Sequence, residues 1–226
     1  MHSRFKYTLA AACLAVALIP LAQAQLLLSG NVTGEFTDAP GPNDTIYNAP
    51  DGSSNYFRSG IPETAADLQT AIEFWKVNFT DVGPGLVASD LFKVTNGRTL
   101  LHSTATAAHF DLNLELTAPE SQDHMLTSIA FTIENTPNQP NDINVNDWYT
   151  ITATGISPFQ VGDYLVQFEF VAPESFQILE NSSLRVGDLY VRFTPVPEPS
   201  TYAAFGAALL LGVVGFRRFR NRAITI

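Results

Sequence analysis

The chain has little cysteine, little positive charge and little charge of any kind. Charged residues make up 15% of the 226 positions, with 12 Lys and Arg against 22 Asp and Glu, and Cys13 is the single cysteine. An acidic chain of this kind argues against nucleic-acid or anionic-membrane partners, because both require a basic surface. It favours solubility, cations, or uncharged and cationic glycans.

The sequence also lacks the common catalytic motifs. It has no H-E-x-x-H zinc motif, G-x-S-x-G elbow, P-loop or dinucleotide fingerprint. None of His102, His109 and His124 falls in a metal-ligand spacing, and the alternation around His109 places it on a solvent face. A glycosidase needs only two carboxylates about 5–10 Å apart, but among so many acids some pair meets that condition by chance. The sequence therefore predicts a protein that is not an enzyme.

The N-terminus has the three parts of an export signal. Arg4 and Lys6 are basic, residues 8–19 are apolar, and Ala22 and Ala24 form a small-x-small cleavage site. We expect residues 1–24 to be a signal peptide, exported by the Sec translocon and removed by signal peptidase after Ala24.

Cys13 allows a competing interpretation, a lipoprotein signal with Cys13 as the lipidated residue. Only about five apolar residues precede it, whereas an apolar signal region needs roughly 7–15. We therefore expect Cys13 to be discarded, which leaves the exported domain without disulfides or thiolate chemistry.

The C-terminus has a rigid polar segment, an apolar segment and a basic cluster, in that order. Pro197 and Pro199 hold Glu198 in extended backbone. The uncharged segment Tyr202–Phe216 would form a helix of about 22 Å, short of the roughly 30 Å hydrocarbon core, and thinning of the bilayer could close the gap. The arginines that follow favour a cytoplasmic C-terminus; they are Arg217, Arg218, Arg220 and Arg222. A plain single-pass anchor is the alternative.

These three parts resemble the PEP-CTERM sorting signal, over residues 196–222. The resemblance implies that exosortase, a membrane-embedded protease or transpeptidase of Gram-negative bacteria that make exopolysaccharide, recognises Pro197, Glu198 and Pro199 and cuts near Pro199. The protein would be held in the inner membrane as a precursor and then reach the cell surface or extracellular matrix.

Between the two signals lies a single acidic domain, residues 25–195. From Gln25 to Pro199 there are six basic and 22 acidic residues, a net charge of −16. The length is ample for one hydrophobic core.

Period-two alternation makes this domain all-β. Residues 110–116 place Phe and Leu on one face and polar residues on the other, and residues 125–133 and 164–170 repeat the pattern. The second of these predicts Met125 and Thr127 on the inner face. Several short strands with turn signals between them predict an antiparallel, jelly-roll-like β-sandwich.

Three local patterns carry more specific expectations. Asn96-Gly97 predicts a hairpin turn between residues 91–95 and 98–102. Residues 63–74 permit a helix, although Leu68 to Phe74 could equally be a strand. Residues 184–193 read as a final strand pair or as one strand bulged at Gly187.

The domain is similar to the choice-of-anchor K family of bacterial surface modules. The similarity rests on short motifs spread over residues 30–193; they are Gly34-Glu35-Phe36, Pro40-Gly41-Pro42, Thr95-Asn96-Gly97, Asn135-Thr136-Pro137-Asn138, Asp142-Ile143 and Phe176–Glu180 before Ser183. Members of the family end in alternative anchoring signals, PEP-CTERM among them. The similarity implies a surface location and no particular chemistry.

One polar run could bind a ligand. Oxygen-bearing side chains suit Ca²⁺, and the candidate ligands are Asn138, Asn141, Asp142 and Asn144, with Asn146 and Asp147 beyond them. The run does not fit the EF-hand pattern, and Asn and Asp also favour turns, so a structural loop is the alternative. Apart from this calcium, no cofactor is expected.

Trp148 and Tyr149, next to this run, could form a platform on which sugar rings stack. The alternative is that they belong to the core. The sequence thus leaves three functional classes: a non-catalytic surface or matrix protein associated with exopolysaccharide or biofilm, which we favour, a carbohydrate-binding module with or without calcium, and a polysaccharide hydrolase.

Overall fold

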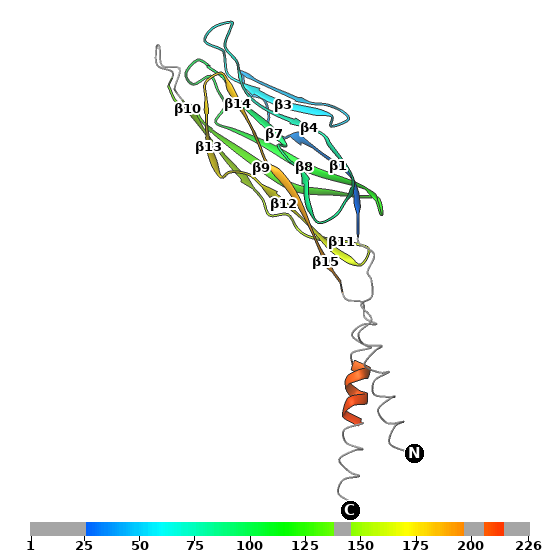
Figure 1. The fold of residues 1–226 in the computed structure, drawn as a ribbon. Coiled ribbons are helices and arrows are strands. Elements are labelled where there is room, and N and C mark those ends of the chain that lie inside the picture. Colours follow the sequence, from blue (N-terminus) through cyan, green and yellow to red (C-terminus); the bar gives the residue numbers. More distant parts are fainter. Residues whose placement is uncertain (1–25, 138–145, 197–205, 215–226) are drawn as a thin grey trace, which may run out of the picture.

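The computed structural model describes residues 26–137, 146–196 and 206–214, and its domain is an antiparallel β-sandwich (Figure 1). The described residues form fifteen strands in three sheets. Every pairing between these strands is antiparallel. The predicted sandwich is thus confirmed.

The largest sheet has six strands and forms one layer. In spatial order they are β13 (Ser175–Leu179), β10 (Asn146–Ala153), β9 (Gln122–Glu134), β8 (Ala107–Ala118), β1 (Leu28–Phe36) and β5 (Val77–Val82).

Two smaller sheets face it. The five-stranded sheet has the order β14 (Ser182–Val186), β7 (Phe92–Asn96), β4 (Thr70–Trp75), β3 (Ser54–Ser59) and β2 (Asp44–Asn48). The four-stranded sheet has the order β11 (Phe159–Val161), β12 (Tyr164–Val171), β15 (Asp188–Pro195) and β6 (Gly85–Ala88).

Phenylalanine rings join the layers. Phe110 of β8 lies 4.8 Å from Phe74 and 5.1 Å from Phe92, measured between ring centroids. Phe92 also contacts Phe131 of β9 at 5.1 Å and Phe170 of β12 at 6.1 Å. All three sheets therefore share one core, in which rings prefer the tilted and edge-on arrangements seen here.

The predicted alternation holds along β8, where Phe110, Leu112, Leu114 and Leu116 are buried. It fails at one point of β9. The register of β8 against β9 shifts between Leu112 and Asn113, so Leu126 and Thr127 are both buried while Met125 is 61% exposed. The prediction for Met125 was wrong because this bulge interrupts the alternation of β9, so the Met125 side chain points to solvent instead of into the core.

The predicted hairpin at Asn96-Gly97 is also wrong. Asn96 ends β7, which pairs with β4 and β14 and not with the residues that follow it. Gly97 instead allows the backbone after β7 to pass close to the backbone where β4 begins. A Cβ at residue 97 would lie 2.2 Å from the carbonyl carbon of Gln69 and 2.4 Å from the backbone nitrogen of Thr70.

The C-terminal strands cross from one sheet to another. β14 pairs with β7 in the five-stranded sheet, and β15 pairs with β12 and β6 in the four-stranded sheet. Gly187 connects them with a φ of +90°, and a Cβ there would lie 2.8 Å from the Phe170 ring. Residues 184–193 therefore belong to the last two strands of the domain, as one alternative predicted, and these strands pair with others rather than with each other. Residues 63–74 form no helix; the strand alternative holds from Thr70 onward, where β4 begins.

The crossover runs the length of the sandwich. Figure 1 shows β14 beginning at the end of the domain where β10 also begins, and β15 finishing at the opposite end, near β11 and the start of β1. Val196, just after β15, donates its backbone N–H to Asp163. The described N-terminal and C-terminal ends of the domain thus leave it at the same end.

The C-terminal apolar segment contains a helix over residues 206–214, within the predicted span Tyr202–Phe216. Across the described segments, no helix combines the length and apolar character that crossing a membrane requires. The signal peptide with Ala22 and Ala24, the motif residues Pro197, Glu198 and Pro199, and the cluster with Arg217, Arg218 and Arg220 lie outside the described residues.

Candidate functional site

The predicted calcium ligands Asn138, Asn141, Asp142 and Asn144 lie outside the described residues. Asp147, at their C-terminal side, is described, and its carboxylate accepts two hydrogen bonds of 2.8 Å, from the backbone N–H and the hydroxyl of Thr136. Within the described ranges, no group of three or more His, Cys, Asp or Glu side chains is placed to hold a metal ion.

The predicted sugar platform of Trp148 and Tyr149 is wrong. The two residues are consecutive in β10, so their side chains point to opposite faces of the sheet. Trp148 is 43% exposed, whereas Tyr149 is fully buried and stacks on Phe176. A sugar ring could reach only one of them.

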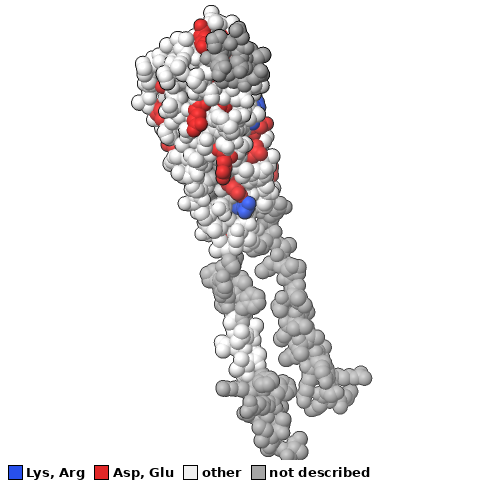
Figure 2. Space-filling view, turned by 90° about the vertical axis from the view of Figure 1, so that its left-hand side faces the viewer, with Lys and Arg blue, Asp and Glu red and all other residues white. Residues whose placement is uncertain are grey.

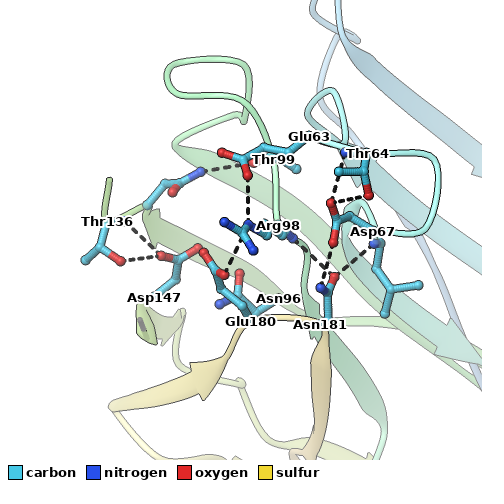
Figure 3. Close-up of polar contacts among 12 residues, drawn as sticks. Glu63, Thr64, Asp67, Asn96, Arg98, Thr99, Thr136, Asp147, Glu180 and Asn181 are labelled. Atoms are coloured by element: carbon cyan, nitrogen blue, oxygen red, sulfur yellow. Dashed lines mark hydrogen bonds and ion pairs between the residues drawn. The ribbon is translucent and has the colours of Figure 1, made fainter. Parts of the chain in front are cut away.

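A polar cluster centred on Arg98 occupies the end of the sandwich where β14 begins (Figure 3). Arg98 follows β7, and its Nε donates a hydrogen bond of 2.7 Å to Glu63. The same Nε lies 3.7 Å from the Glu180 carboxylate, which belongs to the turn between β13 and β14. One guanidinium therefore joins segments that are far apart in sequence.

Glu180 is the least satisfied member of this Arg98 cluster. Its side chain is 5% exposed, and its Oε1 has no hydrogen-bond partner. Burial raises the pKa of Glu180; Arg98 opposes this shift, and the negative charge of Asp147 reinforces it. Burial likewise raises the pKa of Asp147, against the hydrogen bonds from Thr136. The cluster thus holds two carboxylates whose side chains are little exposed, and the charge of Asp147 disfavours that of Glu180.

A second part of the cluster is more exposed. Asn181 donates to Asp67 at 2.9 Å and accepts the backbone N–H of Leu68 at 2.9 Å. Thr64 donates its hydroxyl to Asp67 at 2.8 Å. The hydrogen bonds from Thr64 and then from Asn181 lower the pKa of Asp67. The loop before β4 is in this way fastened to the turn that begins β14.

Among the hollows of the described domain, a groove over the five-stranded sheet lies next to the Arg98 cluster. This groove of 620 Å³ borders the cluster at Asp67 and Asn181 and extends over the five-stranded sheet to Arg58 and Lys93. A polar pocket of 360 Å³ lies over β1 and β8, lined in part by Glu35, Lys76 and Glu115. Among the charged side chains on the face shown in Figure 2, acidic ones predominate over basic ones.

No sequence pattern predicts the Arg98 cluster directly, because its members come from separate turns. A partial signal was present, however. Asn96, Thr136 and Glu180 all belong to short motifs that the sequence analysis singled out. The structure brings these motifs to one end of the sandwich, where Asn96 donates to the carbonyl of Ile178 at 2.8 Å.

Comparison with known proteins concerns the tail. The profile of the PEP-CTERM protein-sorting motif matches residues 195–220. The chain carries a PEP-CTERM sorting motif. The match includes Pro197, Glu198, Pro199 and the first arginines after the apolar segment, and this motif indicates exosortase-dependent sorting to the cell surface. No curated protein matches the chain.

The motif and the fold together define how the domain is presented. The PEP-CTERM segment begins at the last residue of β15, at the end of the sandwich opposite the Arg98 cluster (Figure 1). From Ser182 to Pro195 the chain extends over about 40 Å at the usual rise of a strand. The Arg98 cluster and the neighbouring groove are therefore remote from the processed tail.

Proposed function

We propose that this chain is a non-catalytic surface or matrix protein of a Gram-negative bacterium, exported through the Sec translocon and processed by exosortase. In this proposal its jelly-roll-like domain is a module of the choice-of-anchor K type that contributes to the exopolysaccharide layer or biofilm. The observation that carries the proposal is the sorting motif at residues 195–220, directly after a folded and strongly acidic β domain.

The arrangement of the domain supports a role in presentation. The segment on which exosortase would act begins at one end of the sandwich, so the opposite end is separated from it by the length of the domain. An acidic surface keeps such a domain soluble at high local concentration.

The state of the buried carboxylates supports a non-catalytic role. Asp147 is 2% exposed and accepts both hydrogen bonds from Thr136, while Glu180 lies against Arg98. A general acid must reach the substrate, and neither group is open to one. These carboxylates are better suited to fixing the turns around them.

Processing tests the proposal in a host that has exosortase. Mass spectrometry of the exported protein should find an N-terminus at Gln25 and a C-terminus near Pro199. Replacing Glu198 by Ala should leave the intact tail in the inner membrane. Replacing the exposed Glu174 by Ala, a loop residue of the domain, is the matched control and should leave processing unchanged.

Fractionation then tests the destination. The processed protein should co-purify with the exopolysaccharide fraction, and it should be lost from that fraction in a strain without exosortase. Recovery of exported wild-type protein with Arg217 to Arg222 still attached would contradict the sorting step.

A further inference from the structure

The outer face of the five-stranded sheet gathers aromatic rings and cations. We name it the cation–aromatic face, and its members are Tyr47, Tyr56, Arg58, Glu73, Trp75, Lys93 and Arg185. They share a face because they occupy alternate positions of their strands, with the core residues between them. Phe57, Ile72, Phe74 and Val94 are these intervening residues, and all are buried.

The strand register aligns most of these side chains in one row. Tyr47 of β2 lies opposite Tyr56 of β3, and Tyr56 lies opposite Glu73 of β4. Glu73 is paired with Lys93 of β7, which is paired with Arg185 of β14. The row crosses all five strands, perpendicular to them, as a bound linear chain could do.

The rings are ordered by contacts within the face. Tyr47 and Tyr56 stack, with ring centroids 5.3 Å apart. The guanidinium of Arg58 lies 4.3 Å from the centre of the Tyr56 ring, and that of Arg185 lies 5.4 Å from the centre of the Trp75 ring. These contacts fix the side chains before any ligand arrives, which lowers the entropic cost of binding.

The same side chains are accessible. Tyr47 is 43% exposed and Trp75 39% exposed, although both are large aromatic residues. The Arg58 side chain is 44% exposed and that of Lys93 35% exposed. Exposed aromatic rings beside polar groups are typical of binding surfaces rather than of a plain solvent face.

The 620 Å³ groove lies along this face. Its floor contains the small, buried side chains of Ala71 and Thr95. Arg58, Glu73 and Lys93 also line it, as do Pro62 and Leu68 of the loop before β4. The sheet thus offers a depression next to the exposed rings, of a size that suits sugar residues.

The cation–aromatic face differs in charge from the rest of this acidic domain. Three of the six basic residues of the domain lie on it, Arg58, Lys93 and Arg185, and Glu73 is the one acidic residue on these strands that shares their face. Glu73 is held between Arg58 at 3.6 Å and Lys93 at 3.0 Å. The strands of this face therefore carry three cations against one carboxylate, and Asp67 of the neighbouring loop is the other carboxylate that lines the groove, whereas the whole domain is strongly negative.

We propose that the cation–aromatic face binds an acidic polysaccharide, with sugar rings on Tyr47, Tyr56 and Trp75 and sugar carboxylates against Arg58, Lys93 and Arg185. This inference rests on the proposed function, because it names the class of partner that the surface protein would bind. It replaces the uncharged and cationic glycans that the overall composition favours, since the local distribution of charge decides what binds.

The acidic surface on the rest of the domain disfavours some polyanions more than others. Duplex DNA carries one negative charge per about 1.7 Å of its axis, so a bound duplex would place many phosphates against acidic surface. A polysaccharide with one carboxylate per sugar has more widely spaced charges and offers apolar ring faces for stacking. The combination of rings and few cations thus favours the glycan.

The exported protein, purified from the exosortase-containing host, can be tested with polygalacturonate and with its fully methyl-esterified form. The two probes share a backbone and differ in the carboxylate charge. We expect binding to polygalacturonate that weakens as salt is added, and at least tenfold weaker binding to the ester. Trp75→Ala and Arg185→Ala should each weaken binding about tenfold.

Matched controls lie on other sheets. Trp148→Ala removes a tryptophan of similar exposure from β10, and Arg192→Ala removes an exposed arginine from β15, so both should bind like wild type. Thermal unfolding of every variant shows whether the fold is kept.

Equal binding of the ester, equal binding of duplex DNA, or equal loss in Trp148→Ala and Trp75→Ala would overturn the proposal. No binding to either glycan would overturn it as well. These outcomes are separate from the processing test: correct sorting with unchanged co-purification of Trp75→Ala and Arg185→Ala in the exopolysaccharide fraction would reject this face and leave the proposed function in place.

Discussion

The phenol of Tyr149 donates a hydrogen bond of 3.3 Å to Oδ1 of Asn96, inside the domain. Tyr149 belongs to β10 of the six-stranded sheet, and Asn96 ends β7 of the five-stranded sheet. Both residues are fully buried, and the other end of the Asn96 amide donates to the carbonyl of Ile178. One polar connection thus fixes how the two layers meet beneath the Arg98 cluster.

Tyr149→Phe should therefore destabilise the domain. It leaves the buried Oδ1 of Asn96 without its donor, which costs about 1–2 kcal/mol. For a domain of this size we expect a fall in melting temperature of about 2–8 °C, measured by circular dichroism. Tyr47→Phe, at an exposed phenol, is the matched control and should be neutral, so equal effects would show that the Tyr149 hydrogen bond contributes nothing.

Gly97→Ala should destabilise the domain through overpacking. The new Cβ would meet backbone atoms of residues 68–70 at 2.2–2.4 Å, and backbone cannot move aside as a side chain can. We expect a loss of about 2–3 kcal/mol in urea unfolding. Gly155→Ala enters open space and should change stability little, by comparison. A tolerated Gly97→Ala would contradict the close packing of β7 against the start of β4.

Arg98 should matter far more than a surface arginine. Arg98→Met leaves the buried Glu180 carboxylate without its cation, and we expect a loss of about 3 kcal/mol. Adding Glu180→Gln removes the uncompensated charge and should restore part of this loss, an effect that a general packing defect would not show. Arg192→Met is the control: its pair with Glu169 is exposed and should contribute about 0–1 kcal/mol.

Glu180→Gln should change how stability depends on pH. The pKa of Glu180 is raised in the folded state, so its contribution to stability is fully present below its unfolded pKa of about 4 and is lost as pH rises through the folded pKa. The glutamine variant lacks this loss. Its free energy of unfolding relative to wild type should therefore increase between about pH 4 and pH 7 in urea titrations. A difference that stays constant, or falls with pH, would contradict a raised pKa.

Strand composition could be predicted from the sequence where one face of a strand meets the core. Phe110 to Leu116 alternate and are buried as expected, because period two is imposed by the pleat itself. The same alternation failed to predict the exposure of Met125. A bulge depends on how two strands pair, so the sequence of one strand alone does not reveal it. The hairpin predicted at Asn96-Gly97 failed for a related reason. Glycine is required at residue 97 because the backbone of residues 68–70 packs against it, and the local sequence does not reveal that contact.

The candidate sites were harder to predict than the fold. Trp148 and Tyr149 are adjacent in sequence, and the alternation of β10 separates them, so proximity along the chain was a poor guide to proximity at a surface. Glu63, Arg98 and Glu180 come from three distant turns that only the sheet topology brings together. The sorting motif, by contrast, is read as a linear segment, and it could be predicted in full from the residues alone.

The crossover at Gly187 has a mechanical consequence. Any pull on the chain at Val196 enters the domain along β15, which is hydrogen-bonded in eight register pairs to β12 and also to β6. Because the pull runs parallel to these strands, their hydrogen bonds are loaded together in shear rather than opened one after another. A protein held through its tail would thus bear tension on a strand that is paired on both of its edges.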